Sequence, residues 1–157
     1  MEEILESIGI SMLPIAELRG GIPYALLHGV NPYVAYFVCV LANCIAFPIV
    51  YFFLNTFHTR LIKLEWYQQL FERFVSRTRK KVGKSIEKWG FWGLMVFVMI
   101  PLPVTGAYTG SFAAWLFNFK KRQAFMAIAL GVFIAGIIVS AISLLGIESL
   151  SFLTKKL

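Results

Sequence analysis

The chain has few of the residues that carry metal and redox chemistry, with two cysteines and two histidines among 157 residues. Cys39 and Cys44 are five positions apart, which places them on different faces of a helix and matches no metal-binding pattern, so we expect two buried thiols. His28 and His58 have no acid or cysteine clustered with them, so we expect no metal site and no cofactor. No nucleophile and base form a pattern typical of an active site, which argues against an enzyme.

Basic residues are absent from the start of the chain. Glu2, Glu3 and Glu6 precede the first base, Arg19. A cleavable signal peptide begins with positive charge, so we expect the first apolar segment to be retained.

The composition is too apolar for a typical soluble domain. Hydrophobic residues make up 59% of the chain and its mean hydropathy is +0.74, against about 45–50% apolar residues in soluble proteins. We therefore predict a single all-α integral membrane domain over residues 1–157. The net charge of +7 does not indicate nucleic-acid binding, because twelve of the 15 bases lie in residues 57–90 and 120–122, as expected for loops on the cytoplasmic side of the cell membrane.

Residues 7–28 are apolar but interrupted, and the interruption contains Glu17 and Arg19. A spanning helix needs about 20 apolar residues, and a broken helix leaves unpaired backbone groups in lipid. We predict a re-entrant hairpin of two half-helices. Pro14 and Pro23 are expected to end or start half-helices.

Residues 91–118 repeat this pattern, and Pro101, Pro103, Gly106 and Gly110 interrupt an uncharged apolar stretch. The bases at residues 120–122 return the chain to the side of residues 57–90. We therefore predict a second re-entrant hairpin over residues 91–118.

Two uninterrupted spans are predicted, over residues 33–56 and 123–146. In the first, Asn43 either hydrogen-bonds a neighbouring helix or faces a transport path. In the second, Gly131 and Ala135 allow close approach of another helix, and we expect a homodimer packed through them. Between the spans, the apolar residues of 57–90 recur at three-to-four spacing and the bases occupy other positions, as in an amphipathic helix on a membrane surface. We therefore predict an inverted repeat, in which a re-entrant hairpin followed by a span occurs twice with opposite orientation. The basic segment is predicted to be cytoplasmic.

Three stretches resemble the small multi-drug export protein family, which itself resembles the wider DedA/VTT superfamily. They are residues 16–23 (AELRGGIP), 101–110 (PLPVTGAYTG) and 129–139 (ALGVFIAGIIV). The resemblance implies paired re-entrant hairpins and membrane translocation. For DedA-like relatives it implies a lipid phosphate or phospholipid as cargo, whereas the family name implies drug efflux. DedA-like proteins carry further charges in their second half, and residues 101–118 here carry none.

Glu17 and Arg19 are the predicted centre of the site. Charges at this depth must pair, reach water or be neutralised. Either they form an ion pair that locks the hairpin tip, or Arg19 binds an anion with its planar fork while Glu17 couples protons or gates the path. We expect the glycines to let the two hairpin tips approach each other and to adopt backbone angles that other residues rarely adopt. Hydroxyl groups of the second hairpin tip are expected to donate hydrogen bonds. The other candidate binding residues are Gly20, Gly21, Asn43, Thr105, Gly106, Tyr108 and Thr109, and the residues expected to shape the hairpins are Pro14, Pro23, Pro101, Pro103 and Gly110.

These features favour a transporter or flippase for an amphipathic anion such as a polyprenyl phosphate or phospholipid. A small multidrug efflux transporter and a non-transporting assembly scaffold are the alternatives. The expected partners are membrane lipids, an anionic lipid or amphipathic small molecule, and a second copy of the chain, with no nucleic acid.

Overall fold

The computed structural model describes residues 1–102 and 105–154, with side chains described for these except at residues 59, 81 and 148–154. Pro103 therefore lies outside the described residues. Every regular element in the described part is a helix. In chain order they are α1 (Glu2–Ser11), α2 (Glu17–Leu27), α3 (Pro32–Cys44), α4 (Ala46–Thr56), α5 (His58–Leu61), α6 (Glu65–Trp89), α7 (Phe91–Met99), α8 (Ala107–Leu116) and α9 (Lys121–Thr154).

Two pairs of short helices replace the two interrupted apolar segments. The helices α1 and α2 pack on each other and on α3, and α7 and α8 pack on each other and on α9. Pro14 lies in the first break, between α1 and α2, and Pro101 lies in the second, between α7 and α8. The first pair begins at Glu2, earlier than residue 7, because the acids of its first turn suit the positive end of a helix.

The prediction that Pro23 ends or starts a half-helix is wrong. It lies inside α2, which begins six residues earlier at Glu17. A proline there cannot donate to the carbonyl of Arg19, four residues before it, so α2 continues with one backbone bond fewer.

The span predicted over residues 33–56 is divided at Ile45 into α3 and α4. Pro48 explains the division, because it has no N–H to donate to the carbonyl of Cys44 and its ring crowds that carbonyl. Asn31 caps the start of α3 by accepting the N–H of Tyr33 at 2.9 Å.

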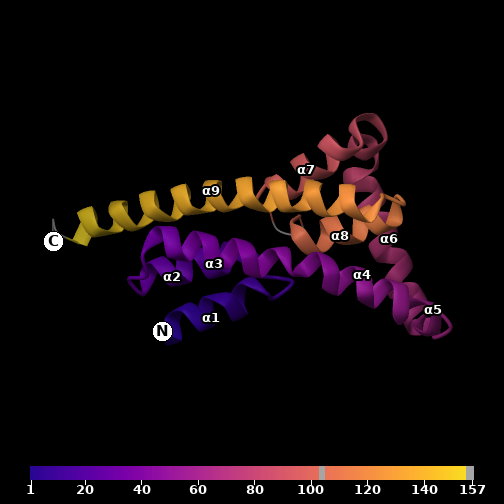
Figure 1. The fold of residues 1–157 in the computed structure, drawn as a ribbon, viewed down its shortest axis with the longest axis horizontal. Coiled ribbons are helices and arrows are strands. Elements are labelled where there is room, and N and C mark those ends of the chain that lie inside the picture. The colour runs from indigo at the N-terminus through magenta and orange to yellow at the C-terminus, as the bar shows by residue number, and fades with distance from the viewer. Residues whose placement is uncertain (103–104, 155–157) are drawn as a thin grey trace.

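The two longest apolar helical stretches are long enough to cross a membrane. They are Pro32–Thr56, which comprises α3 and α4, and Lys121–Ile147 within α9. In Figure 1 both run along the long axis of the molecule, with α1 and α2 near the end that holds both termini and α6, α7 and α8 towards the other end. The breaks between the short helices therefore lie in the middle of the molecule.

The predicted homodimer contact through Gly131 and Ala135 is wrong. A Cβ added to Gly131 would lie 2.7 Å from Cβ of Val98 and 2.8 Å from the carbonyl oxygen of Met95, both on α7. Ala135 is also buried within the protomer. The small residues of α9 thus receive helices of the same chain, since close helix packing needs small side chains at the contact.

The basic segment forms the short helix α5 and the long amphipathic helix α6. His58 of α5 packs in an aromatic cluster with Tyr67, Phe71 and Trp115. This cluster joins the basic segment to α8, and those bases of α6 whose side chains the structure describes are exposed.

Candidate functional site

The two breaks meet through the side chains of Glu17 and Arg19, which open α2. These residues lie next to the second break, at residues 100–106, although they are more than 80 positions away in the sequence. Backbone groups in a break have no helical partners, and in an apolar environment each one needs a partner from elsewhere.

Glu17 caps the start of α8. Its side chain is buried, and Oε1 accepts the backbone N–H of Tyr108 at 3.3 Å. The first N–H groups of a helix have no intrahelical acceptor and carry partial positive charge, so a carboxylate stabilises that end. Glu17 has a φ of +50°, which is unusual for a residue with a side chain and turns the chain sharply into α2.

Gly106 makes room for that carboxylate. A Cβ at this position would lie 2.0 Å from Oε2 of Glu17, and the residue has a φ of +130°. Both observations require glycine. Gly106 thus provides the close approach between the two breaks that was predicted for the glycines, because it admits Glu17 to the start of α8.

Arg19 binds the carbonyl groups of the second break. Its Nη1 donates to the carbonyl oxygen of Leu102, and its Nη2 donates to the carbonyl oxygen of Thr105 and lies 3.3 Å from Oγ1 of Thr105. Nη2 is also 3.8 Å from Oε2 of Glu17. The planar fork of arginine suits this task, since it presents several donors in fixed directions.

A side chain next to the second break also donates a hydrogen bond to the first break. The hydroxyl group of Tyr108 donates to the carbonyl oxygen of Met12, just past the end of α1. Each break therefore satisfies backbone groups of the other. We call this set of residues the cross-capped junction; its members are Met12, Glu17, Arg19, Leu102, Thr105, Gly106 and Tyr108.

Thr105 holds the second break in shape from within. Its Oγ1 lies 2.7 Å from the carbonyl oxygens of both Ile100 and Leu102, and 3.2 Å from the N–H of Leu102. Thr109 is half-buried in the first turn of α8. Of the hydroxyl groups predicted at the opposing tip, those of Thr105 and Tyr108 therefore form hydrogen bonds within the junction.

Asn43 is fully buried beside the Glu17 carboxyl group. Neither atom of its amide makes a hydrogen bond of normal geometry. The Glu17 carboxyl group beside it is the acceptor within reach of this amide, and a buried polar group is destabilising unless such a partner is available.

Gly20 and Gly21 lie within α2, and the expectation of special backbone angles is wrong for them and for Gly110, since none has a positive φ. Their role is close packing. A Cβ on Gly21 would lie 1.9 Å from Oγ of Ser11 and 3.2 Å from Sγ of Cys39, and one on Gly110 would lie 2.4 Å from Cγ2 of Val98. Gly21 thus lets α1, α2 and α3 meet.

Within the described part of the chain, no three histidine, cysteine or acidic side chains gather into a group suited to a metal ion. The sequence predicted most side chains of the junction. It missed Met12 and Leu102. These residues take part through their backbone carbonyl groups, which the identity of the side chain does not indicate.

A family model described as "Putative small multi-drug export protein" matches residues 17–138. The match starts at Glu17, directly after the first break, and contains the second break and most of the chain. The chain belongs to this family. No curated protein and no solved structure shows significant similarity to it. Membership in the small multi-drug export family, together with two apolar helical stretches long enough to span, indicates a membrane transporter rather than an enzyme.

Proposed function

We propose that this protein exports an amphipathic substrate across the cell membrane and that the cross-capped junction is its gate. The observation that carries the proposal is that Glu17 and Arg19 of one break hold the backbone of the other. In this proposal, a path between the two breaks opens only when Glu17 and Arg19 release the backbone of the second break and bind other groups. Charged groups at such a depth are costly and usually functional.

The membrane arrangement we propose is an inverted repeat of two re-entrant hairpins, each followed by a span, with α6 on the cytoplasmic side. Its support is that α1 and α2 pack on α3 while α7 and α8 pack on α9. Leu13 and Ile15 in the first break and Leu102 in the second are exposed apolar side chains, as suits breaks at membrane depth. Transporters commonly place a binding site between broken helices in this way.

The substrate we propose is an amphipathic anion with a phosphate head, as in the DedA-like relatives that the sequence resembles. A phosphate oxygen is a stronger acceptor for a guanidinium group than a neutral carbonyl oxygen is. It would replace the carbonyl groups of Leu102 and Thr105 on Arg19. The start of α8 would then bind the anion once Glu17 withdraws, because helix N-termini favour negative charge.

Glu17 has a second role in this proposal. While it is ionised it repels an incoming anion, and when it is protonated it releases the start of α8. Proton uptake at Glu17 would therefore accompany anion binding, and the unpaired amide of Asn43 lies beside the carboxyl group that changes.

The test is transport in proteoliposomes with a fluorescent polyprenyl phosphate, using wild type, Arg19→Gln and Glu17→Gln. We expect loss of movement in both variants. Arg73→Gln, an exposed base on α6, is the matched control and retains transport. Movement of the lipid by the Arg19 variant at the wild-type rate would overturn the anion site.

Efflux of cationic drugs is the second candidate, favoured by the family description. A cation would pair with Glu17 and displace Arg19 from it. The same vesicles loaded with a cationic dye distinguish the two substrates, since only drug efflux moves the dye. If neither compound moves and both variants fold like wild type, the junction is a structural lock and a scaffold role is favoured.

A homodimer stays a prediction. Since α7 covers Gly131, the second copy would have to pack on another face of the protein. Crosslinking in lipid vesicles at low protein density tests this, and recovery of monomer alone would contradict it.

A further inference from the structure

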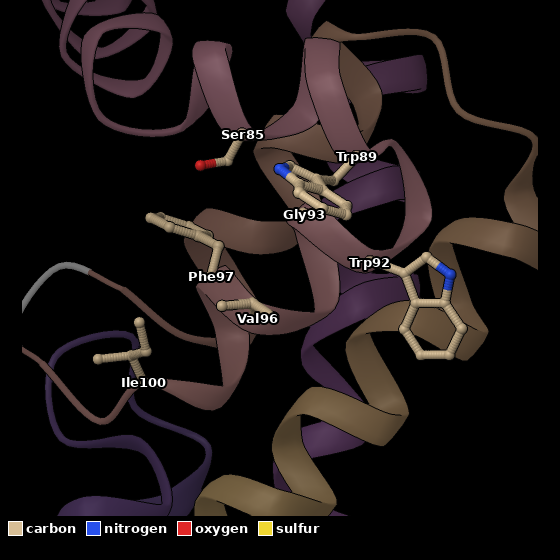
Figure 2. Close-up of a pocket in the computed structure, with 7 residues that line it drawn as sticks. All are labelled: Ser85, Trp89, Trp92, Gly93, Val96, Phe97 and Ile100. Carbon is tan, nitrogen blue, oxygen red and sulfur yellow. The ribbon is translucent and has the colours of Figure 1, made fainter.

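A groove lies between the end of α6 and the outer face of α7, away from the junction. Its volume is about 730 Å³, and its lining is almost entirely apolar. Figure 2 shows Ser85 and Trp89 on α6, and Val96, Phe97 and Ile100 following one another along α7 towards the second break. Trp92 and Gly93 complete the lining.

The groove arises from the way α6 joins α7. Gly90 connects them with a φ of +50°, which turns the chain sharply between two helices. At Gly93 the two helices touch, since a Cβ there would lie 2.3 Å from the carbonyl oxygen of Ser85. Beyond this contact the apolar side chains of α7 are left partly uncovered.

The uncovered surface is too apolar to face water. Trp89 and Trp92 are each 60% exposed, and Val96 and Ile100 are each 40% exposed. Contiguous apolar surface of this kind marks a binding site. Tryptophan rings are enriched where the acyl region of a bilayer meets the headgroups, which fits their place at the α6 end of the groove.

The helix α6, which forms that end of the groove, is positively charged. Residues 73–88 contain seven bases and one acid, Glu87. Lys84 and Lys88 are exposed and directly precede the lining residues Ser85 and Trp89 in the sequence, and Nζ of Lys88 lies 5.4 Å from the ring centroid of Trp89. A ligand with an apolar tail along α7 would bring its head to these two amines.

The length of the groove fits one acyl chain. The nine residues of α7 span about 13 Å at 1.5 Å per residue. One leaflet of a bilayer has about 15 Å of hydrocarbon, half of the total core. An acyl chain in the groove would therefore reach Ile100 while its phosphate stays at the level of α6.

We propose that this groove binds one acyl chain of an anionic phospholipid, with the phosphate held by Lys84 and Lys88. The site is separate from the junction and does not depend on which substrate is exported. A lipid that merely surrounds the protein would show no preference for charge, whereas this site prefers an anionic headgroup.

The test measures quenching of Trp89 and Trp92 by phospholipids with brominated acyl chains, in a Trp66→Phe, Trp115→Phe background. Brominated phosphatidylglycerol and phosphatidylcholine are compared by the mole fraction that gives half-maximal quenching. We expect an about 30-fold preference for phosphatidylglycerol, the ratio that about 1 kcal/mol for each of two bases gives. Lys88→Gln reduces this preference about fivefold, the ratio for one base.

A second groove provides the matched control. It lies between α3 and α9 and has a mostly apolar lining that includes Phe37. Unlike Ser85 and Trp89 in the first groove, none of its lining residues has a base next to it in the sequence. A reporter at Phe37→Trp, with Trp89→Phe and Trp92→Phe added, is expected to quench equally with both lipids. Val96→Phe fills the first groove and is expected to raise the half-quenching fraction of phosphatidylglycerol.

Three results would each overturn the proposal. They are equal half-quenching fractions for the two lipids at Trp89 and Trp92, an unchanged preference in Lys84→Gln/Lys88→Gln, and unchanged quenching in Val96→Phe. The same preference at the Phe37→Trp reporter would also do so, because it would show a general attraction of the protein for anionic lipid. None of these results depends on transport, so the proposed export function is tested independently.

Discussion

The guanidinium group of Arg19 donates a hydrogen bond to the carbonyl oxygen of Thr105, 86 residues further along the chain. The same group reaches the carbonyl oxygen of Leu102. One side chain near the start of the protein thus supplies donors to a loop in its second half. The stability of the second break is therefore expected to depend on the first.

Arg19→Lys is expected to lower the midpoint of thermal unfolding although it keeps the positive charge. A lysine amine does not present the fork that reaches two carbonyl groups at once. The part-buried bond to the carbonyl group of Thr105 is expected to contribute most, because a carbonyl group left without a donor away from water costs about 1–3 kcal/mol. Unfolding in lipid nanodiscs measures the change. Arg73→Lys on the exposed face of α6 is the control, and a similar midpoint for both variants would contradict the role of the fork.

Gly106→Ala is expected to destabilise the protein more than a backbone effect alone explains. The added Cβ would meet the Glu17 carboxylate at 2.0 Å, and the residue has a positive φ. Gly29→Ala is the matched control, because Gly29 has a φ of +76° with no atom within 4 Å of the added Cβ. Equal losses in thermal stability for the two variants would mean that the contact with Glu17 contributes nothing.

Gly131→Leu is expected to prevent correct packing of α9 on α7 within one protomer. The added side chain would collide with Val98 and with the backbone at Met95, and overpacking of a tight contact costs about 1–3 kcal/mol or more. Gly146→Leu has open space around it and serves as the control. Size-exclusion chromatography with a thermal-unfolding assay separates misfolding from loss of a dimer. A folded, stable monomer of Gly131→Leu, formed from a wild-type dimer, would contradict packing within the protomer.

The stability that depends on His58 is expected to fall as the pH falls. Burial lowers the pKa of His58 below its ordinary value, so the unfolded chain takes up a proton at a higher pH than the folded protein does. The free energy of unfolding therefore decreases from about pH 7 through the ordinary histidine pKa of about 6.5 and on towards the folded pKa. Thermal unfolding between pH 8 and pH 5, with His58→Phe beside wild type, measures the difference. If the difference in unfolding midpoint between wild type and His58→Phe stays constant over that range, protonation of His58 does not contribute to the stability.

The sequence predicted the positions of the two helix breaks because proline and glycine change backbone geometry locally. It also placed Glu17 and Arg19 at the first break, since charge in an apolar stretch is conspicuous. It did not predict where α2 begins. The capping geometry at Glu17, with its positive φ, depends on α8, which lies far away in the sequence, and so Pro23 falls inside the helix instead of at its start.

The partners of Arg19 could not be predicted for a related reason. They are carbonyl groups, which every residue has, so only the folded arrangement selects Leu102 and Thr105. The groove on α7 was also missed. Trp89 and Trp92 fit an apolar pattern in the sequence, and only the turn at Gly90 and the contact at Gly93 leave their rings beside an uncovered face. The small residues of α9 predicted a close contact, but the sequence did not say that the neighbour belongs to the same chain.

The distance along the chain between Arg19 and Thr105 has a consequence for biosynthesis. Because they are 86 positions apart, synthesis at about 5–20 residues per second separates their appearance by about 4–17 s. During that interval the first break has charged groups and no carbonyl groups of the second break to receive them. The start of α2 would therefore reach its final arrangement only after α7 and α8 have been synthesised.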